Sequence, residues 1–193
     1  MGKIIVSESV SLDGVMQDPT DGDTSFAGWF NQLTGKDREA WAEVQFEEAL
    51  GAEAMLLGRR TYEWLVAKGW PTRTGGWADR LTGLPKYVVS STLRELGWDN
   101  TTVLSGDVVD DVTKLRDAVA GDIVVNGSGQ LVHTLLEHDI VDELRLMICP
   151  FVLGAGDGVF DRTGHRQTMR LMDTRTVGAG LVRLTYGAGS SDR

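Results

Sequence analysis

The chain has 193 residues, of which 41% are hydrophobic and 24% are charged, and this composition is typical of a single globular domain over residues 1–193. Its formal net charge of −9 argues against broad nucleic-acid binding, so an anionic ligand would need a local basic site. The apolar runs are far shorter than the ~20 residues of a membrane span, and the first residues lack the pattern of a secretion signal. We therefore expect a cytoplasmic protein whose single cysteine, Cys149, fills the core.

The predicted elements begin with a strand over residues 3–10 and a long loop that is rich in glycine and aspartate. The length of this loop indicates an active-site loop or a lid. Asp37 can cap a helix that runs to about Leu50. An apolar strand over residues 52–58 follows, and a short helix over residues 59–67 begins directly behind it.

The second half of the chain alternates strands and helices and then ends in two adjacent strands. This order predicts a three-layer α/β sandwich with a mostly parallel central sheet and a C-terminal antiparallel hairpin. Residues 186–193 are expected to be a frayed tail. The predicted strands cover residues 86–92, 101–106, 122–129, 141–154, 169–177 and 181–186, and the predicted helices cover residues 107–120 and about 130–138.

The segment LLGRRTYE is the first candidate binding element. A strand ends at Gly58 and a helix begins at once, so backbone N–H groups and the positive end of the helix dipole meet at one place. Arg59 and Arg60 add guanidinium groups, and Thr61 adds a hydroxyl, which suits phosphate oxygens. The alternative is a pair of solvent-exposed arginines, although positive charge at a helix start opposes the dipole.

The segment VVSST places three hydroxyl residues, Ser90, Ser91 and Thr92, at the carboxyl end of a predicted strand. Ligands of open α/β sheets bind at this end of the strands. Arg94 would be placed to help bind a second phosphate. Small hydroxyl residues also cap helices and turns, so that interpretation stays open here.

The segment VNGSGQLV contains Gly127 and Gly129, where the backbone can approach a ligand closely before another helix start. The pattern is not a dinucleotide-binding fingerprint, because the third glycine is replaced by Val132. A plain tight turn is an equally good interpretation of these residues alone.

Other chemistries have weaker support in the sequence. His133 and His138 are five residues apart and fall on different helix faces, and His165 stands in a predicted loop, so no metal site is expected. The aspartates of DPTDGD lack the pattern of a calcium loop. Ser128 lacks the spacing of a nucleophile elbow, so nucleophilic catalysis is not predicted.

Taken in chain order, these segments resemble the dihydrofolate reductase-like superfamily, and more closely its branch with the C-terminal reductase domain of the bifunctional riboflavin biosynthesis deaminase-reductase. The resemblance spans nearly the whole chain. It depends on the opening strand with SLDG, and on LLGRRTYE, KYVVSST, VNGSGQLV and VDELRLMICPFVLGAGDGVF.

The resemblance implies a dihydrofolate reductase-like fold, an NADPH cofactor and a homodimer. It implies that the strand-to-helix segment holds phosphates, that the three hydroxyl residues face the adenosine 2′-phosphate, and that the later glycine turn cradles the pyrophosphate and the nicotinamide side. The end of the first strand and the loop behind it would cover the nicotinamide. The implied cofactor residues are Gly58, Arg59, Arg60, Thr61, Ser90, Ser91, Thr92, Asn126, Gly127, Ser128, Gly129, Gln130, Leu131, Val10, Gly14 and Val15.

The substrate half of the pattern departs from both relatives. Ala42 stands near the position of the acidic residue that binds the pterin in dihydrofolate reductases, and Asn126 replaces an acidic residue of the riboflavin-type glycine turn. Glu43 and Glu47 are nearby and lie on one helix face, so either is a candidate catalytic carboxylate, with Glu47 or a positioned water as the proton source. The alternative is that both are simply exposed.

Aromatic residues provide the remaining evidence for a substrate site. Trp29 and Phe30 lie in the long loop, and Trp70 and Trp77 flank a segment with glycine and proline. They can stack on a flat ring, although core or dimer packing also explains tryptophan residues.

The sequence therefore predicts an NADPH-dependent reductase that transfers a hydride to a C=N or C=O group of a small heterocyclic substrate, such as a pterin or an aminopyrimidine riboside. Two alternatives stay open. One is a non-catalytic, dimeric NADP-binding module that regulates a partner protein, and the other is a true dihydrofolate reductase. No nucleic-acid or membrane partner is expected.

Overall fold

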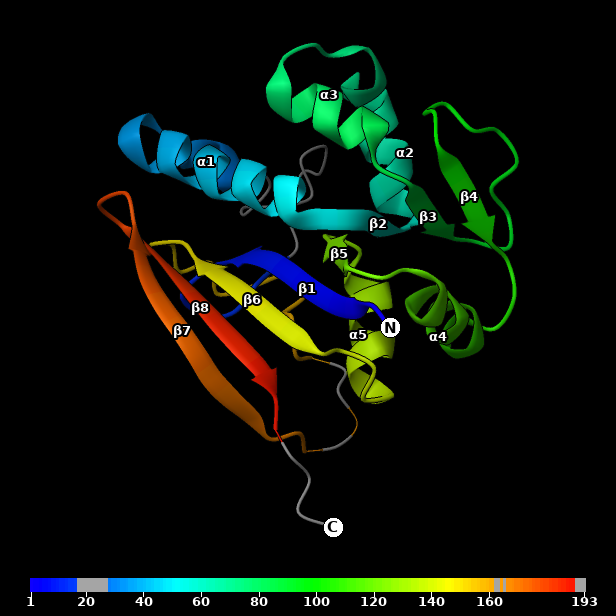
Figure 1. Cartoon of the computed structure of the whole chain (residues 1–193). Helices are drawn as coiled ribbons and strands as arrows, with labels where there is room; N and C mark the ends of the chain where they lie inside the picture. The colour runs from blue at the N-terminus through cyan, green and yellow to red at the C-terminus, as the bar shows by residue number, and fades with distance from the viewer. Residues whose placement is uncertain (17–27, 162–163, 165, 190–193) are drawn as a thin grey trace.

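The computed structural model describes residues 1–16, 28–161, 164 and 166–189, and within them one sheet forms the middle layer of the molecule (Figure 1). The strands lie in the order β4-β3-β2-β5-β1-β6-β8-β7. Neighbours from β4 to β6 are parallel, whereas β8 runs antiparallel to both β6 and β7. The strands are β1 Lys3–Val10, β2 Ala52–Gly58, β3 Lys86–Val89, β4 Thr101–Leu104, β5 Asp122–Asn126, β6 Glu143–Ile148, β7 Met169–Val177 and β8 Leu181–Ala188.

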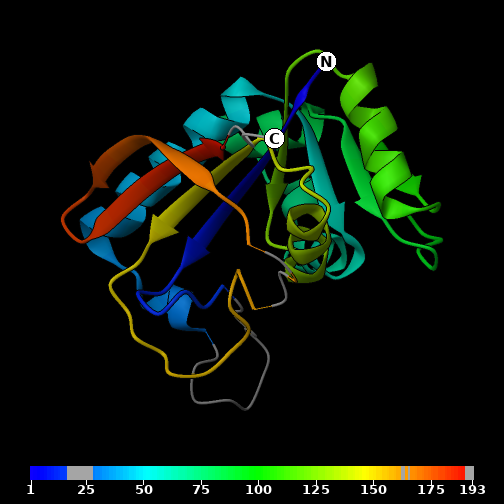
Figure 2. The same cartoon turned by 90° about the horizontal axis from the view of Figure 1, so that it is seen from below.

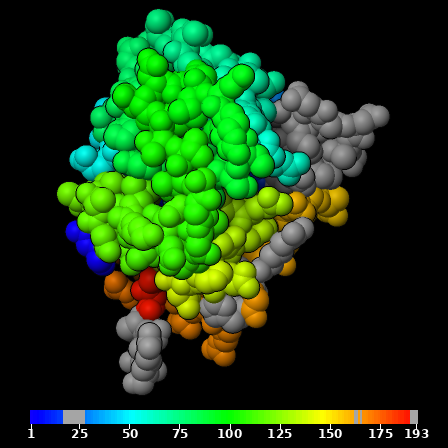
Figure 3. Space-filling model, turned by 90° about the vertical axis from the view of Figure 1, so that its right-hand side faces the viewer, coloured from blue at the N-terminus to red at the C-terminus, as the bar shows by residue number. Residues whose placement is uncertain are grey.

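Helices cover both faces of the sheet and make the outer layers (Figures 1 and 2). Helices α1, α2 and α3 lie on one face, and α4 and α5 lie on the other. From the side, the green β3–β4 region and α4 form one continuous surface beside the yellow-green α5 (Figure 3). The helices are α1 Gly35–Gly51, α2 Arg59–Ala67, α3 Gly76–Gly83, α4 Val108–Ala118 and α5 Gly129–Glu137, with short 3-10 segments η1 Trp29–Gln32 and η2 Trp70–Thr72.

The alternation of side chains along β1 divides the core between the two faces. Ile4, Val6 and Val10 belong to the apolar cluster shared with α4 and α5. Ser7 and Ser9 point to the opposite face, where they contact side chains of α1. The central position of β1 in the sheet therefore places its carboxyl end between the two helix layers.

The predicted three-layer architecture is confirmed, and several bounds are confirmed with it. The helix over residues 59–67 and the strands over residues 3–10, 52–58 and 169–177 have the predicted ends. No helix in the described ranges is long and apolar enough to span a membrane. Cys149 is buried as expected, and burial raises the pKa of its thiol to about 12.

The prediction that Asp37 caps the first long helix is wrong. Helix α1 begins at Gly35 with Thr34 at the N-cap position. The Asp37 carboxylate instead accepts hydrogen bonds from the backbone N–H groups of Ala179 and Gly180, at 2.6 and 3.1 Å, in the β7–β8 turn. A distant turn thus supplies donors that the local sequence pattern does not reveal.

The C-terminal strand and the segment before β3 also differ from the prediction, and the predicted strands over residues 86–92, 101–106, 122–129 and 141–154 are shorter in the structure. Strand β8 continues to Ala188, whose backbone N–H donates to the carbonyl of Asp142 at 3.0 Å, so the frayed tail does not start at residue 186. Helix α3 was not predicted, because it lies between Gly75 and Gly83 in a glycine-rich segment that reads as a loop. Residues 17–27 of the predicted active-site loop or lid lie outside the described residues.

Candidate functional site

A cleft of ≈ 2090 Å³ lies at the edge of the sheet where the parallel strands β1, β2, β3 and β5 end. Helix α1 and the starts of α2 and α5 line it together with the turns that follow these strands. The carboxyl ends of parallel strands are the usual binding edge of an open α/β sheet. The three segments that the sequence singled out therefore meet at one place.

The Ser128 hydroxyl joins the starts of α2 and α5. It accepts a hydrogen bond from the Gly58 backbone N–H at 2.8 Å and donates to Thr61 Oγ1 at 2.9 Å. Gly127 has a φ of +61°, and a Cβ atom there would lie 3.2 Å from Thr61 Cγ2. A Cβ atom on Gly58 would lie 3.3 Å from the Ser128 Cβ. Both glycines therefore permit the close contact that makes the two turns one continuous surface.

The first turns of α2 and α5 lack the side-chain cap that α4 has. The carboxylate of Asp107 caps α4 by accepting from the backbone N–H groups of Val109 and Asp110, at 3.0 and 3.1 Å. The N-cap residues of α2 and α5, Gly58 and Ser128, make no side-chain capping hydrogen bond to their helices. Backbone donors and two positive dipole ends thus point into the cleft, an arrangement that suits an anionic ligand.

Both arginines at the start of α2 line the cleft, but Arg59 also has a partner on its own helix. Its Nη1 atom lies 2.9 and 3.2 Å from the two carboxylate oxygens of Glu63. The two side chains are 43% and 47% exposed, and exposed pairs of this kind contribute little free energy. Arg59 can therefore exchange Glu63 for a ligand phosphate, and Arg60 is exposed beside it.

Of the three hydroxyl residues that follow β3, one stabilises the turn and two are exposed in the cleft. The Ser90 hydroxyl is buried and accepts from the backbone N–H groups of Thr92 and Leu93, at 3.1 and 2.9 Å, so it forms the turn itself. Ser91 and Thr92 are exposed and line the cleft. Arg94 donates to the carbonyl of Leu93 and is not a lining residue.

The three residues expected to cover the nicotinamide do not lie where the resemblance implies. Val10, Gly14 and Val15 do not line the cleft; Val10 belongs to the core, and Val15 forms an isolated bridge with Gly158. Met16, the next residue, does line it.

In the later glycine turn, all six predicted residues line the cleft. Asn126 directs its amide toward β1, where Nδ2 donates to the carbonyl of Ser7 at 3.1 Å. Leu131 is buried and Gln130 is exposed.

The structure places both predicted catalytic carboxylates outside the cleft. Helix α1 buries Val44 and Glu48, which leaves Glu43 and Glu47 on its exposed side. Glu47 Oε2 pairs there with Arg175 Nη1 at 3.0 Å. The prediction that one of them faces a substrate is corrected accordingly, and two other carboxyl groups, Glu8 and Glu48, line the cleft instead.

Glu48 is held by partners from three strands. Its Oε2 accepts from the Ser7 hydroxyl at 2.7 Å, and its Oε1 lies 2.6 Å from Arg183 Nη2 and 3.4 Å from Arg145 Nη1. Arg145 also pairs with Glu143 at 2.5 Å. Glu48 is therefore an ion-paired carboxylate at the base of the cleft.

Glu8 has a very different environment, although it lies close to Glu48. The residue is only 6% exposed, and its Oε1 atom has no hydrogen-bond partner among the described residues. Burial raises the pKa of this carboxyl group well above its usual range. The nearby charge of Glu48 raises the pKa further, while a hydrogen bond with the Gly127 backbone opposes both effects.

Aromatic side chains form a continuous wall on the other side of the cleft. The ring centroids of Phe30 and Trp41 are 4.8 Å apart, those of Trp41 and Trp77 are 5.8 Å apart, and those of Trp70 and Trp77 are 5.2 Å apart. Trp29 extends the wall from Phe30 at 5.7 Å. All four predicted aromatic residues are thus lining residues, and Trp41 joins the two pairs.

Arg38 lies against this aromatic wall. Its guanidinium carbon is 4.7 Å from the ring centroid of Phe30 and 4.8 Å from that of Trp41, which are distances of cation–π contacts. Its Nη1 atom is buried without a hydrogen-bond partner among the described residues. The sequence did not indicate Arg38, because nothing local shows that its helix face meets the loop aromatics.

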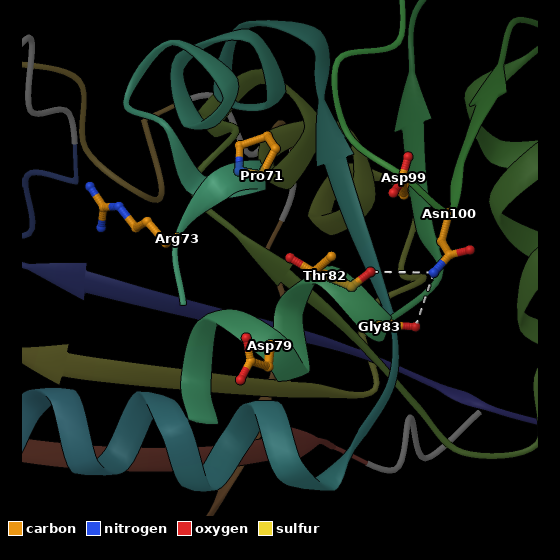
Figure 4. Close-up of a pocket in the computed structure, with 7 residues that line it drawn as sticks. All are labelled: Pro71, Arg73, Asp79, Thr82, Gly83, Asp99 and Asn100. Atoms are coloured by element: carbon orange, nitrogen blue, oxygen red, sulfur yellow. Dashed lines mark hydrogen bonds between the residues drawn. The ribbon is translucent and has the colours of Figure 1, made fainter. Parts of the chain in front are cut away.

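A second, smaller depression of ≈ 650 Å³ lies beside α3 and shares Arg73 with the cleft (Figure 4). Asn100 Nδ2 donates to the carbonyls of Thr82 and Gly83 there, at 3.3 and 3.4 Å, while Arg73 extends away from the other labelled side chains. None of the predicted site residues lines it.

The described part of the chain contains no group of three His, Cys, Asp or Glu residues that could hold a metal ion. His133 is buried with Nε2 at 3.0 Å from the carbonyl of Gly158, and His138 is exposed. His165 and the DPTDGD aspartates lie outside the described residues.

The fold and the cleft together define an open α/β protein with a candidate anion-binding site at the carboxyl edge of its sheet, and sequence comparison specifies the family. The chain belongs to the family described as the RibD C-terminal domain, whose model matches residues 2–183.

Two relatives from Bacillus subtilis (strain 168) match nearly the full length. "Uncharacterized protein YyaP" is 27% identical over 197 residues, which cover 95% of this chain and 94% of the relative. "Uncharacterized protein YwjB" is 23% identical over 184 residues, with 95% and 97% coverage.

Solved structures with low sequence identity share the fold. A candidate riboflavin biosynthesis protein from Shewanella sp. PV-4 aligns with a TM-score of 0.74 at 19% identity, covering 97% of this chain and 99% of that one. A pyrimidine reductase-like protein from Corynebacterium diphtheriae aligns with a TM-score of 0.59 at 15% identity, covering 98% and 92%. These similarities establish the fold of the chain.

Proposed function

We propose that the protein is an NADPH-dependent reductase that transfers a hydride to a C=N or C=O group of a small heterocyclic substrate of the pterin or aminopyrimidine-riboside type. The observation that carries this proposal is the single cleft, which joins two uncapped helix starts to a wall of aromatic rings. Membership of a reductase-like family supports the same reaction class.

The residues of the two helix starts fit a dinucleotide phosphate group. Gly58 and Gly127 let the turns approach closely, and no Cβ atom fills the space between them. The backbone donors of α2 and α5, with Arg59 and Arg60, would hold the pyrophosphate and the 2′-phosphate, and Ser91 and Thr92 would add hydroxyl donors. The bound cofactor would supply the hydride, while the protein supplies binding and orientation.

The aromatic wall supports a flat substrate ring. Edge-to-face contacts fix the rings of Phe30, Trp41 and Trp77, so a planar ligand can stack there without ordering new side chains. The Nη1 atom of Arg38, which has no hydrogen-bond partner in the described part of the chain, can donate to a carbonyl or an anionic oxygen on that ligand.

Two measurements on the purified protein test the proposal. NADPH and NADH are first titrated calorimetrically, and NADPH is expected to bind more tightly than NADH. NADPH oxidation is then followed at 340 nm with a panel of dihydropterins, aminopyrimidine ribosides and cyclic imines, and at least one is expected to be reduced.

The possible outcomes separate the alternatives. A protein that binds neither nucleotide is not a nicotinamide-dependent reductase. Tight NADPH binding without oxidation across the panel would favour the regulatory module. Turnover of dihydrofolate with tight competition by methotrexate would identify a dihydrofolate reductase.

A further inference from the structure

Glu8 interrupts an otherwise apolar face of β1. Ile4, Val6 and Val10 share its side of the strand and belong to the core beneath α4 and α5. An apolar residue at this position would continue that core, whereas a buried carboxyl group without a full set of hydrogen bonds lowers stability. The position of Glu8 in the lining of the cleft therefore calls for a functional explanation.

The two carboxyl groups of the cleft differ in their partners. Glu48 lies near two guanidinium groups and accepts from a serine hydroxyl. Glu8 has no arginine or lysine partner in the described ranges, and the negative charge of Glu48 is its electrostatic neighbour. Burial without a cationic partner disfavours the charged form of a carboxyl group, so the pKa of Glu8 is raised and its protonated form is favoured.

We propose that the carboxyl group of Glu8 is the proton donor to the substrate heteroatom in the reduction. This inference depends on the proposed function. As the hydride adds to the carbon of a C=N or C=O group, the π electron pair moves to the nitrogen or oxygen. That atom takes the proton from Glu8, and the resulting carboxylate regains a proton from water. Hydride and proton together complete the two-electron reduction with NADPH as the reductant.

The alternative to proton donation is a purely structural role for Glu8. The Gly127 backbone hydrogen-bonds to its carboxyl group, so Glu8 could serve only to position the glycine turn. Glutamine keeps the length and an acceptor oxygen of glutamate but has no acidic proton. Glu8→Gln therefore separates the two roles, and Glu39→Gln, at an exposed position of α1, is the matched control.

The first test does not require turnover. Protein labelled with ¹³C at the glutamate carboxyl carbons is titrated by NMR, and Glu8→Gln identifies the resonance of Glu8. This carbon is expected to report a protonated carboxyl at pH 7 and to shift when NADPH is added, whereas the resonance of the exposed Glu39 is expected not to shift with NADPH. Glu48 is the charged neighbour of Glu8, Arg145 and Arg183 pair with Glu48, and His133 and Asp157 are further titratable residues that line the same cleft.

The outcomes of the NMR test are distinguishable. An ionised Glu8 at pH 7, or a Glu8 resonance that is unchanged while calorimetry shows NADPH binding, overturns the assignment of the proton donor. Absence of NADPH binding in the wild-type protein instead counts against the proposed function.

The second test uses the substrate panel of the oxidation assay. Glu8→Gln should lower kcat about 100-fold or more, the usual contribution of a general acid, and leave the Kd for NADPH within about twofold. Glu8→Asp should retain part of the activity with an altered pH profile of kcat, and Glu39→Gln should behave as wild type. Unchanged kcat in Glu8→Gln would leave Glu8 with a structural role only.

Discussion

Lys86, the first residue of β3, is a fully buried lysine whose ammonium group hydrogen-bonds to carbonyl groups at the carboxyl end of helix α3. Its Nζ atom donates to the carbonyls of Leu81, Thr82 and Leu84, at 2.8, 3.0 and 2.7 Å, and lies 4.7 Å from the ring centroid of Trp98. These are carbonyl groups that the end of a helix leaves without partners. Burial lowers the pKa of the Lys86 ammonium group to about 8.

The lowered pKa predicts how stability changes in alkaline solution. Folded Lys86 releases its proton at about pH 8, whereas the unfolded chain keeps it to about pH 10. The unfolded state thus binds more protons within that window, so the free energy of unfolding rises with pH there. Urea unfolding of wild type and Lys86→Met at several pH values should show the difference growing in favour of wild type from pH 8 to pH 10. A difference that does not depend on pH would refute the prediction.

Asp13, in the SLDG segment, connects the loop after β1 to the segment after β6. Its carboxylate accepts from the Ser11 hydroxyl at 2.6 Å and from the backbone N–H groups of Gly154 and Leu153, at 2.7 and 3.2 Å. These hydrogen bonds, with that of Ser11 the strongest, lower the pKa of Asp13 to about 2. The motif that carried part of the family resemblance is thus a structural clamp beside the cleft.

Asp13→Asn should release this clamp, because an amide cannot accept all three hydrogen bonds as a carboxylate does. Backbone amide exchange at Gly154 is expected to become faster in the variant. In wild type, the clamp should persist at neutral pH and weaken only as the pH falls from about 4 toward 2. Asp117→Asn, at an exposed position of α4, is the control and should leave exchange at Gly154 unchanged.

At the scale of elements, the contact between the starts of α2 and α5 depends on the backbone of Gly127. An alanine there must adopt a φ of +61°, which costs about 1–2 kcal/mol, and its Cβ atom would press on Thr61. Gly127→Ala should therefore lower both the Tm and the affinity for NADPH. Gly51→Ala is the control, because its added methyl group meets open space and a normal φ. Equal effects of the two substitutions would contradict this account.

Helix α2 also provides a test of which phosphate its arginines bind. Arg59→Ala should weaken binding of NADPH more than binding of NADH if Arg59 or its neighbours contact the 2′-phosphate. Calorimetric Kd values for both nucleotides measure this selectivity. Glu63→Gln releases Arg59 from its ion pair and should not weaken NADPH binding. Equal losses for the two nucleotides would assign Arg59 to the pyrophosphate.

Element types and several bounds were predictable wherever the local pattern was strong. The strand-to-helix change at Gly58 and the terminal hairpin follow from hydrophobic periodicity and turn residues. Asp37 was misread because its partners, Ala179 and Gly180, lie far away in the sequence. Helix α3 was missed because tertiary packing of Leu81 and Leu84 outweighs its glycine-rich ends.

The candidate site was less predictable than the fold. The phosphate-facing segments carry recognisable glycine, arginine and hydroxyl patterns. Glu8 was overlooked, although the spacing of Ile4, Val6 and Val10 places it on the buried face of its strand. The sequence alone does not distinguish Glu48 from Glu47 as the buried carboxylate. The packing of α1 against the sheet decides which face of the helix is buried.

At the scale of the whole molecule, one face of the sheet has no helix over β8 and β7 (Figure 2). The pairings of Ile148 with Val182 and of Tyr186 with Leu171 place these apolar side chains on that face. Val182 is 36% and Leu171 is 51% exposed. Among the described residues of these strands, Arg175 and Arg183 lie on the opposite face, so two copies of an acidic chain can bring the apolar side chains together with little charge repulsion. We propose that this face is the interface of a homodimer.

Light scattering after size-exclusion chromatography tests the dimer. The wild-type protein should have twice the 21.0 kDa mass of the chain, and Val182→Asp should shift it to the monomer because a charge would be buried in the interface. Arg175→Gln, on the opposite face, should leave the mass unchanged. A monomeric wild type would refute the proposal.

The hydroxyl of Ser128 links two segments that are 67 residues apart in the chain. Because this hydroxyl belongs to the start of α5 and already bonds to Gly58 and Thr61 at the start of α2, the relative motion of the two turns is restricted before any ligand arrives. The conformational entropy of bringing them together is therefore part of the folding equilibrium and is not subtracted again when a phosphate group binds. Affinity at this edge of the sheet thus depends on how well the whole domain is folded, and substitutions far from the cleft can weaken binding without touching the ligand.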